Sequence, residues 1–239
     1  LYTKFVEAVS KKLPLFFVAE NVKGLLTSNK GWAIKKIKKD FEKVDHVGYD
    51  VTHKLINFAD YGVPQNRERV LIVGVRKDLG IKFEFPDETH KRNPVSVGQA
   101  LKNVEKVKLN NEKLKTSQST VAKLKSIPPG GNYKDSPEHA HRNWMSLIYK
   151  RTHPDKPSPT IVAGGGGGTW GYHFEQPRPL TNRERARIQS FPDNFAFIGN
   201  TTEVRRQLGN AVPPVGVKPV AEELLKLAEK TLSQSVVLS

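Results

Sequence analysis

The chain has 239 residues, of which 37% are hydrophobic, and it contains no cysteine. This length suits one domain, or one and a half, and the lack of thiols excludes disulfides, thiolate metal sites and a thiol nucleophile from these residues. Lys and Arg number 39 against 24 Asp and Glu, a net charge of +15; this favours nucleic acid as a partner, although a basic surface that is only solvated would give the same count.

The first 85 residues follow the pattern of an α/β domain. Apolar residues at helical spacing alternate with short runs of β-branched and aromatic residues. They predict helices over residues 2–12 and 32–41 and strands over residues 15–19, 50–58 and 71–75. The order strand, helix, strand, strand is the one expected for the second half of a doubly wound sheet.

The composition changes after about residue 85. Residues 86–176 are rich in Pro, Gly, Asn, Ser and Lys, and five consecutive glycines occupy positions 164–168. Helical periodicity is weak there and predicts only short helices over residues 97–103 and 119–126. We therefore predict a separate, small, loop-rich domain.

Regular helices return over residues 177–239. Thr181 with Glu184 three residues later forms a capping-box pattern that starts one helix, and two further helices are predicted over residues 202–208 and 213–232. No apolar stretch reaches the roughly 20 residues of a membrane span and no signal peptide is visible, which fits a cytoplasmic protein. The seven histidines lack the spacing of metal ligands, so no metal site is predicted.

Glu20 is the first candidate for chemistry. It follows five apolar residues at the carboxyl end of the first predicted strand, where ligands and catalytic groups collect in open α/β sheets. Burial there would raise the pKa of its carboxyl group, and such an acid could donate a proton to a ring nitrogen. The alternative is a strand-end carboxylate that only caps the next turn.

Gln65, Arg67 and Arg69 form the second candidate group. They alternate along the chain, so in an extended segment all three would share one face. Two guanidinium groups and an amide on one face could bind a phosphate or a pyrimidine carbonyl oxygen. A basic strand edge that charge keeps soluble is an equally good interpretation of these residues alone.

Four segments taken together resemble the DNA cytosine-5 methyltransferases. Residues 17–25 resemble the sixth conserved motif of that family, residues 61–70 the eighth, residues 178–193 the ninth and residues 207–213 the tenth. They occur in family order and at family-like spacing. The resemblance covers nearly the whole chain except the variable stretch between the eighth and ninth motifs.

The resemblance implies a fold and a domain organisation. The fold would be α/β, the second half of a Rossmann-like sheet of an S-adenosylmethionine-dependent methyltransferase plus a small loop-rich target recognition domain. Residues 1–85 would be a partial catalytic domain with motifs six to eight, and residues 86–176 the recognition domain. Residues 177–239 would carry the helices of motifs nine and ten back to the catalytic domain.

The resemblance also implies roles for single residues. Glu20 matches the glutamate that holds a flipped cytosine at N3 and its amino group. Arg67 and Arg69 match arginines that hold cytosine O2 and the nearby backbone, and Gln65 matches a residue that supports that strand. The residues that match the last motif, at the S-adenosylmethionine site, are Asn210, Ala211 and Val212.

Two family motifs are missing from the chain. These are the glycine-rich cofactor loop and the Pro-Cys motif that carries the nucleophile, and both would precede Leu1. We therefore expect a split enzyme or a fragment. A second chain would supply the nucleophile and most of the S-adenosylmethionine pocket, and this chain alone would be inactive.

The variable region matches the recognition domain by position, and its lysines suit phosphate contact. Its candidate base readers or wedges are Arg142, Asn143, Arg151, His153, Trp170 and His173, although for each of them ordinary loop surface is the simpler interpretation. The partner would be duplex DNA with the target cytosine flipped out of the helix, in a restriction-modification system. Two alternatives stay open: a non-catalytic, sequence-specific DNA-binding module, and a tRNA cytosine-5 methyltransferase.

Overall fold

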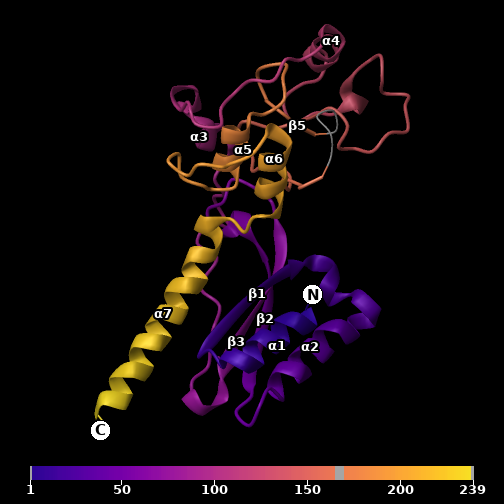
Figure 1. Cartoon of the computed structure of the whole chain (residues 1–239). Helices are drawn as coiled ribbons and strands as arrows, with labels where there is room; N and C mark the ends of the chain where they lie inside the picture. Colours follow the sequence, from indigo (N-terminus) through magenta and orange to yellow (C-terminus); the bar gives the residue numbers. More distant parts are fainter. Residues whose placement is uncertain (1, 165–169, 238–239) are drawn as a thin grey trace. The chain divides into compact units, whose positions relative to one another are not determined.

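The computed structural model describes residues 2–164 and 170–237 (Figure 1). Its contacts divide the chain into two compact units. The first unit comprises Leu1–Asn57, Glu68–Glu88 and Val217–Ser239, and the second comprises Phe58–Arg67 and Thr89–Gly216. Each unit is described by itself.

The first unit is built on a three-stranded sheet. Its strands are β1 (Phe16–Val22), β2 (Tyr49–Asn57) and β3 (Glu68–Arg76), in the order β1-β3-β2, and β3 pairs antiparallel with both neighbours. All three predicted strands are present, and each includes polar residues beside its apolar ones. One prediction was wrong in detail, because β1 does not end at Ala19; Glu20 lies inside the strand, opposite Leu71.

Two helices cover one face of this sheet. They are α1 (Tyr2–Lys12) and α2 (Trp32–Glu42), which lie side by side in Figure 1. Their inward residues, including Val9, Ile34 and Phe41, form one apolar cluster with Phe17 of β1. Gly74 lies opposite Phe17, and a Cβ at that position would collide with the phenyl ring, so the glycine in the apolar run of β3 makes room for this ring.

The second unit contains short helices and long connections. Its helices are α3 (Val97–Leu101), α4 (Gln118–Lys125), α5 (Asn182–Ile188) and α6 (Thr201–Asn210), and two very short parallel strands are β4 (Lys150–Arg151) and β5 (Trp170–Tyr172). The capping box predicted at the start of α5 is confirmed, since Thr181 and Glu184 bond each other's backbone N–H groups. A small core joins α3 and α5 around Ile161, Leu180 and Ile188.

The remaining elements are short 3₁₀ turns and one long helix. The turns are η1 (Lys23–Leu26), η2 (Ser28–Gly31), η3 (Phe58–Tyr61), η4 (Lys77–Leu79), η5 (Val104–Lys106) and η6 (Tyr133–Asp135). The helix α7 (Pro214–Val237) begins at the end of the second unit and continues in the first. None of the helices in the described residues combines the length and the apolar character that crossing a membrane requires.

Candidate functional site

The first unit places Glu20 and Arg69 in direct contact. In the β1–β3 ladder Arg69 lies opposite Val22, which is two residues beyond Glu20 on the same face, so the two side chains are diagonal neighbours. The Nε atom of Arg69 lies 2.7 Å from Oε1 of Glu20. The contact between the sixth and eighth motifs thus follows from strand register, which the sequence analysis did not predict.

This ion pair is only half-buried, which corrects the expectation that Glu20 is buried. The side chains of Glu20 and Arg69 are 24% and 15% exposed. Arg69 also donates from Nη1 to the carbonyl oxygen of Glu68, while its Nη2 makes no hydrogen bond to the described residues. The pair therefore keeps one carboxylate oxygen and one guanidinium nitrogen available to a ligand.

Both side chains lie on the face of the sheet that α1 and α2 do not cover. Phe17, Val70 and Ile72 belong to the core with α1 and α2. Glu20 and Arg69 are offset from them by an odd number of residues along β1 and β3, so they point to the opposite face. A ligand on Glu20 would bind to that opposite face.

Gln65 and Arg67 are buried, and this corrects the prediction of a three-residue fork. Gln65 has no exposed surface; its Nε2 donates to Gln189 at 3.0 Å, and its Oε1 accepts from the backbone N–H of Ile161 at 2.9 Å. Arg67 is 2% exposed and donates to the carbonyl oxygens of Ile161 and Gly209, at 3.0 and 2.9 Å. Neither side chain can hold a pyrimidine in this arrangement, so Arg67 is no longer a base-holding candidate.

These bonds join segments that are distant in sequence. Ile161 accepts from Arg67 and donates to Gln65, and Gly209 approaches Ala163 so closely that a Cβ would collide with its backbone. Parts of the eighth, ninth and tenth motifs thus come together around residues 161–163, which directly precede the glycine run. Sequence spacing gave no signal for this convergence.

Asn210, Ala211 and Val212 lie at the end of α6. Asn210 is the last helical residue and is exposed, and Ala211 is the C-cap in extended conformation. The N–H of Ala211 bonds the carbonyl oxygen of Gln207 at 3.0 Å. Ala211 and Val212 are half-buried, so these three residues can line one edge of a ligand but cannot enclose one.

Of the candidate base readers, Arg142 and Asn143 are exposed on a loop of the second unit. Trp144 anchors this loop, because it packs against Tyr133 and its carbonyl oxygen accepts a hydrogen bond from the Tyr133 hydroxyl. The Arg142 guanidinium lies 5.8 Å from the Trp144 ring centroid. Met145 is 67% exposed beside them. The loop therefore presents polar and apolar side chains on a fixed aromatic base.

Two other candidates are buried, and for them the base-reader interpretation was wrong. Arg151 is 5% exposed and donates to the carbonyl oxygens of four residues, Leu124, Ile127, His173 and Phe174. His173 is also 5% exposed, and its Nδ1 accepts from two backbone N–H groups, at 3.0 and 3.1 Å. Both side chains stabilise the second unit through hydrogen bonds to backbone groups.

His153 is half-buried, and its Nδ1 accepts from the N–H of Asp155 at 3.1 Å. Trp170 starts β5, but its side chain lies outside the described residues, as do glycines 165–168 of the glycine run. Among the described side chains, those of Arg142, Asn143 and His153 reach the surface and remain candidates, and Trp170 stays a prediction.

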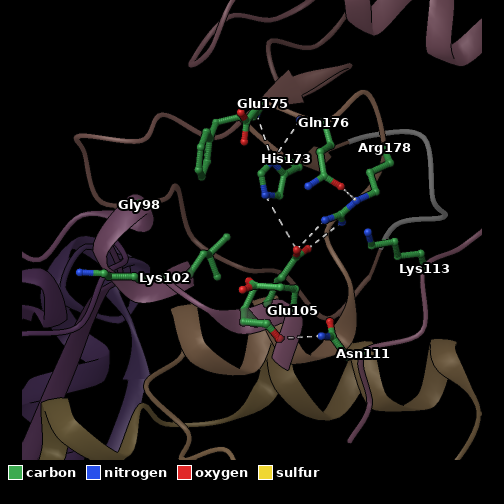
Figure 2. Close-up of a pocket in the computed structure, with 13 residues that line it drawn as sticks. Gly98, Lys102, Glu105, Asn111, Lys113, His173, Glu175, Gln176 and Arg178 are labelled. Carbon is green, nitrogen blue, oxygen red and sulfur yellow. Dashed lines mark hydrogen bonds and ion pairs between the residues drawn. The ribbon is translucent and has the colours of Figure 1, made fainter. Parts of the chain in front are cut away.

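A pocket of about 240 Å³ in the second unit contains a polar cluster that the sequence did not reveal (Figure 2). Arg178 binds both carboxylate oxygens of Glu184, at 2.7 and 2.9 Å, and His173 Nε2 lies 3.9 Å from the same carboxylate. Burial pushes the pKa of Glu184 up, but the bonds from Arg178 outweigh it and hold that pKa below its usual value. Burial also lowers the pKa of His173. Sequence reasoning had given Glu184 only a capping role.

Two arginines of α5, Arg183 and Arg185, are buried and have a structural role. Arg183 is fully buried and donates to the carbonyl oxygens of Leu109, Pro192 and Phe195. Burial lowers the pKa of Arg185 to about 10. In the part of the chain that the structure describes, no group of three or more His, Asp or Glu side chains is arranged to hold a metal ion.

Several known proteins are similar to this chain. A family model described as C-5 cytosine-specific DNA methylase matches residues 1–226. The chain is 52% identical over 237 residues to the type II methyltransferase M.NgoFVII of Neisseria gonorrhoeae and 45% identical over 232 residues to M.BbvI of Brevibacillus brevis. Each match covers 95% of this chain but only 63% and 62% of the relatives, so the chain spans less than two thirds of their length.

Solved structures share the fold. A protein encoded within an E. coli prophage superposes with a TM-score of 0.73 at 23% identity, over 95% of this chain and 74% of that protein. The Entamoeba histolytica methyltransferase EhMeth gives a TM-score of 0.60 at 15% identity, over 94% and 68%. At these identities the likeness establishes a common α/β fold.

Proposed function

Because the chain belongs to the C-5 cytosine-specific DNA methylase family, we propose that it forms the part of a type II DNA cytosine-5 methyltransferase that holds the target cytosine and contacts DNA. The observation that carries this proposal is the Glu20–Arg69 ion pair on β1 and β3. A carboxylate and a guanidinium side by side match the hydrogen-bonding edge of cytosine, which offers an amino group, a ring nitrogen and a carbonyl oxygen.

The pair would work by exchange of partners. In the absence of a base, Arg69 Nε occupies one carboxylate oxygen of Glu20. An entering cytosine would accept a hydrogen bond from Arg69 at O2 and would donate its amino group to Glu20. Since the target atoms lie inside a duplex, the base has to leave the stack first. The half-exposed position of the pair is consistent with such access.

The chemistry explains why an acid is needed at N3. Carbon 5 of cytosine is a weak nucleophile, and addition of a thiolate at C6 converts the ring to an enamine that can take a methyl group at C5. Negative charge develops at N3 during that addition, and Glu20, once it has exchanged Arg69 for the base and taken up a proton from solvent, would stabilise that charge by donating the proton to N3. The proton at C5 leaves after methylation, which allows the thiolate to depart.

The thiolate and most of the cofactor site lie outside these 239 residues. The sequence contains no cysteine, and Asn210, Ala211 and Val212 offer one edge for a ligand. We propose that these three residues contact S-adenosylmethionine, which supplies the methyl group when bound. A separate partner chain has no support from the comparisons, since the relatives carry the matching segment within longer single polypeptides.

Recognition of the DNA site is proposed for the loop of the second unit. Arg142 and Asn143 are exposed and their neighbour Trp144 is anchored, so their donors are preorganised for base edges in the major groove. Met145 adds an apolar contact of the kind a thymine methyl group accepts. Alanine at both Arg142 and Asn143 should reduce the preference for the target site over random duplex more than it reduces total DNA binding.

The test is reconstitution of activity. The chain would be joined to the part of the gonococcal relative that lies outside the match, where the family resemblance places the Pro-Cys motif. We expect transfer of tritiated methyl groups from S-adenosylmethionine to duplex DNA and none when the introduced cysteine is replaced by serine. Site-specific DNA binding without transfer would support the binding-module alternative, and preferential methylation of tRNA in a competition assay would support the tRNA alternative.

A further inference from the structure

The outer face of α2 carries an exposed tryptophan and a row of lysines. Its inner face, with Ile34, Ile37 and Phe41, is buried in the core of the first unit. On the outer face Trp32 is 57% exposed, although a large aromatic side chain gains stability from burial. Neither the core nor the Glu20–Arg69 pair uses this surface, which lies on the other face of the sheet.

Three lysines extend from Trp32 along the helix. Lys35, Lys39 and Lys43 are all exposed and follow one another at intervals of four residues, with Lys43 at the C-cap of α2. They form one row with a rise of about 6 Å between helical neighbours. They form no ion pair with the described residues. Like charges at this spacing weaken a helix, so a bound anion would relieve the repulsion within the row.

Two acidic residues of α2 lie near these lysines, the half-buried Asp40 and the exposed Glu42, and Asp40 is already neutralised. Asp40 accepts hydrogen bonds from Lys36 Nζ at 3.0 and 3.1 Å and from the Tyr2 hydroxyl at 3.0 Å. The same Lys36 ammonium lies 6.0 Å from the centroid of the Trp32 ring. The surface therefore carries the three positive charges of the lysine row and the one negative charge of Glu42, next to one aromatic face.

These side chains line an open pocket of about 360 Å³, and the residues around it are Trp32, Lys35, Lys36, Lys39, Asp40 and Lys43. An aromatic face beside a row of cations is the combination that binds single-stranded nucleic acid, with phosphates on the lysines and a base stacked on the ring. A duplex would offer the phosphates but no free base face. A solvated lysine face would not need the exposed tryptophan.

We propose that the outer face of α2 binds a single-stranded segment of DNA, with phosphates on Lys35, Lys39 and Lys43 and one base stacked on Trp32. This site is separate from the cytosine site and does not depend on methyl transfer. It would hold DNA outside the recognition contacts and without sequence preference.

The test uses the 239-residue chain and an oligodeoxythymidine. Binding would be followed by the fluorescence anisotropy of the labelled oligonucleotide and by quenching of tryptophan fluorescence. The part of the quenching that is lost in Trp32→Phe is assigned to Trp32. We expect Trp32→Ala to weaken binding about 5- to 150-fold, the range for loss of one stacked base. We expect Lys35→Glu/Lys39→Glu/Lys43→Glu to make the slope of log K against log salt shallower by about 2.

A matched triple variant controls for net charge. Lys218→Glu/Lys226→Glu/Lys230→Glu changes the charge of α7 by the same amount, and it should leave the quenching of Trp32 unchanged. Quenching should also persist in the Arg142→Ala/Asn143→Ala variant, which separates this site from the proposed recognition loop. The proposal is overturned if oligodeoxythymidine does not quench Trp32, if polyglutamate quenches it equally, or if the two triple variants lose affinity to the same extent.

Discussion

Two arginines of one motif should fail in different ways when they are replaced. Arg67→Met removes the donors to the carbonyl oxygens of Ile161 and Gly209. A buried acceptor left without its donor costs about 1–3 kcal/mol, so we expect the second unit to lose about 2–6 kcal/mol of unfolding free energy. Arg69→Met removes a half-buried ion pair that solvent still reaches, which contributes about 1 kcal/mol.

The assay is urea unfolding followed by tryptophan fluorescence in a Trp32→Phe background, because the remaining tryptophans, Trp144 and Trp170, belong to the second unit. Arg67→Lys should lie between Arg67→Met and the unchanged chain, since an ammonium group can reach one of the two carbonyl oxygens but lacks the fork. In the reconstituted enzyme Arg69→Met should lose activity at almost unchanged stability. Equal stability losses for Arg67→Met and Arg69→Met would refute the separation of the two roles.

Three further predictions test the fold and the recognition loop. Gly74→Ala should destabilise the first unit by about 1–3 kcal/mol, because the added methyl group overpacks the site against Phe17. Adding Phe17→Leu should recover part of that loss, as measured by urea midpoints in a double-mutant cycle. Additive effects of the two substitutions would contradict the contact. His173→Gln should remove an acid sensitivity of the second unit. Burial lowers the pKa of His173 below 6.5, so the free energy of unfolding is highest above pH 6.5 and falls as the pH drops below that value. An unchanged dependence of stability on pH in the variant would contradict this linkage. Arg151→Met should lower the stability of the second unit by at least as much as Arg67→Met, about 2–6 kcal/mol, because it leaves four carbonyl acceptors instead of two. Arg142→Ala should change DNA affinity only. The reverse pattern would restore Arg151 as a base reader.

Local patterns in the sequence predicted the elements of the first unit well. Apolar spacing located α1, α2 and all three strands, because each of these elements buries one face and repeats with its own period. The capping box at Thr181 located the start of α5 for a similar reason, since it is a local hydrogen-bonding pattern. The end of β1 was misplaced because Glu20 and Asn21 are polar but still pair with β3.

The roles of individual charged residues could not be predicted in the same way. Arg67, Arg69, Arg142 and Arg151 are chemically identical, and only tertiary contacts decide that Arg67 and Arg151 are enclosed by carbonyl oxygens while Arg142 reaches solvent. Alternation along the chain suggested one fork, but regular pairing in β3 starts only at Glu68. Buried arginines are rare in general, which made the wrong interpretation the reasonable one.

Glu20 is the residue proposed to hold the target cytosine. A comparison of Glu20→Gln with Glu68→Gln in the reconstituted enzyme tests this role. Glu68 is the matched control because it lies on the adjacent strand and its exposed side chain pairs with Lys23.

The measurements are kcat for methyl transfer and Kd for duplex DNA. We predict that Glu20→Gln lowers kcat about 10²- to 10⁴-fold, the usual contribution of a general acid, with Kd unchanged, and that Glu68→Gln changes neither. Equal kcat for the two variants, or a loss in Glu20→Gln that lies entirely in Kd, would contradict the account.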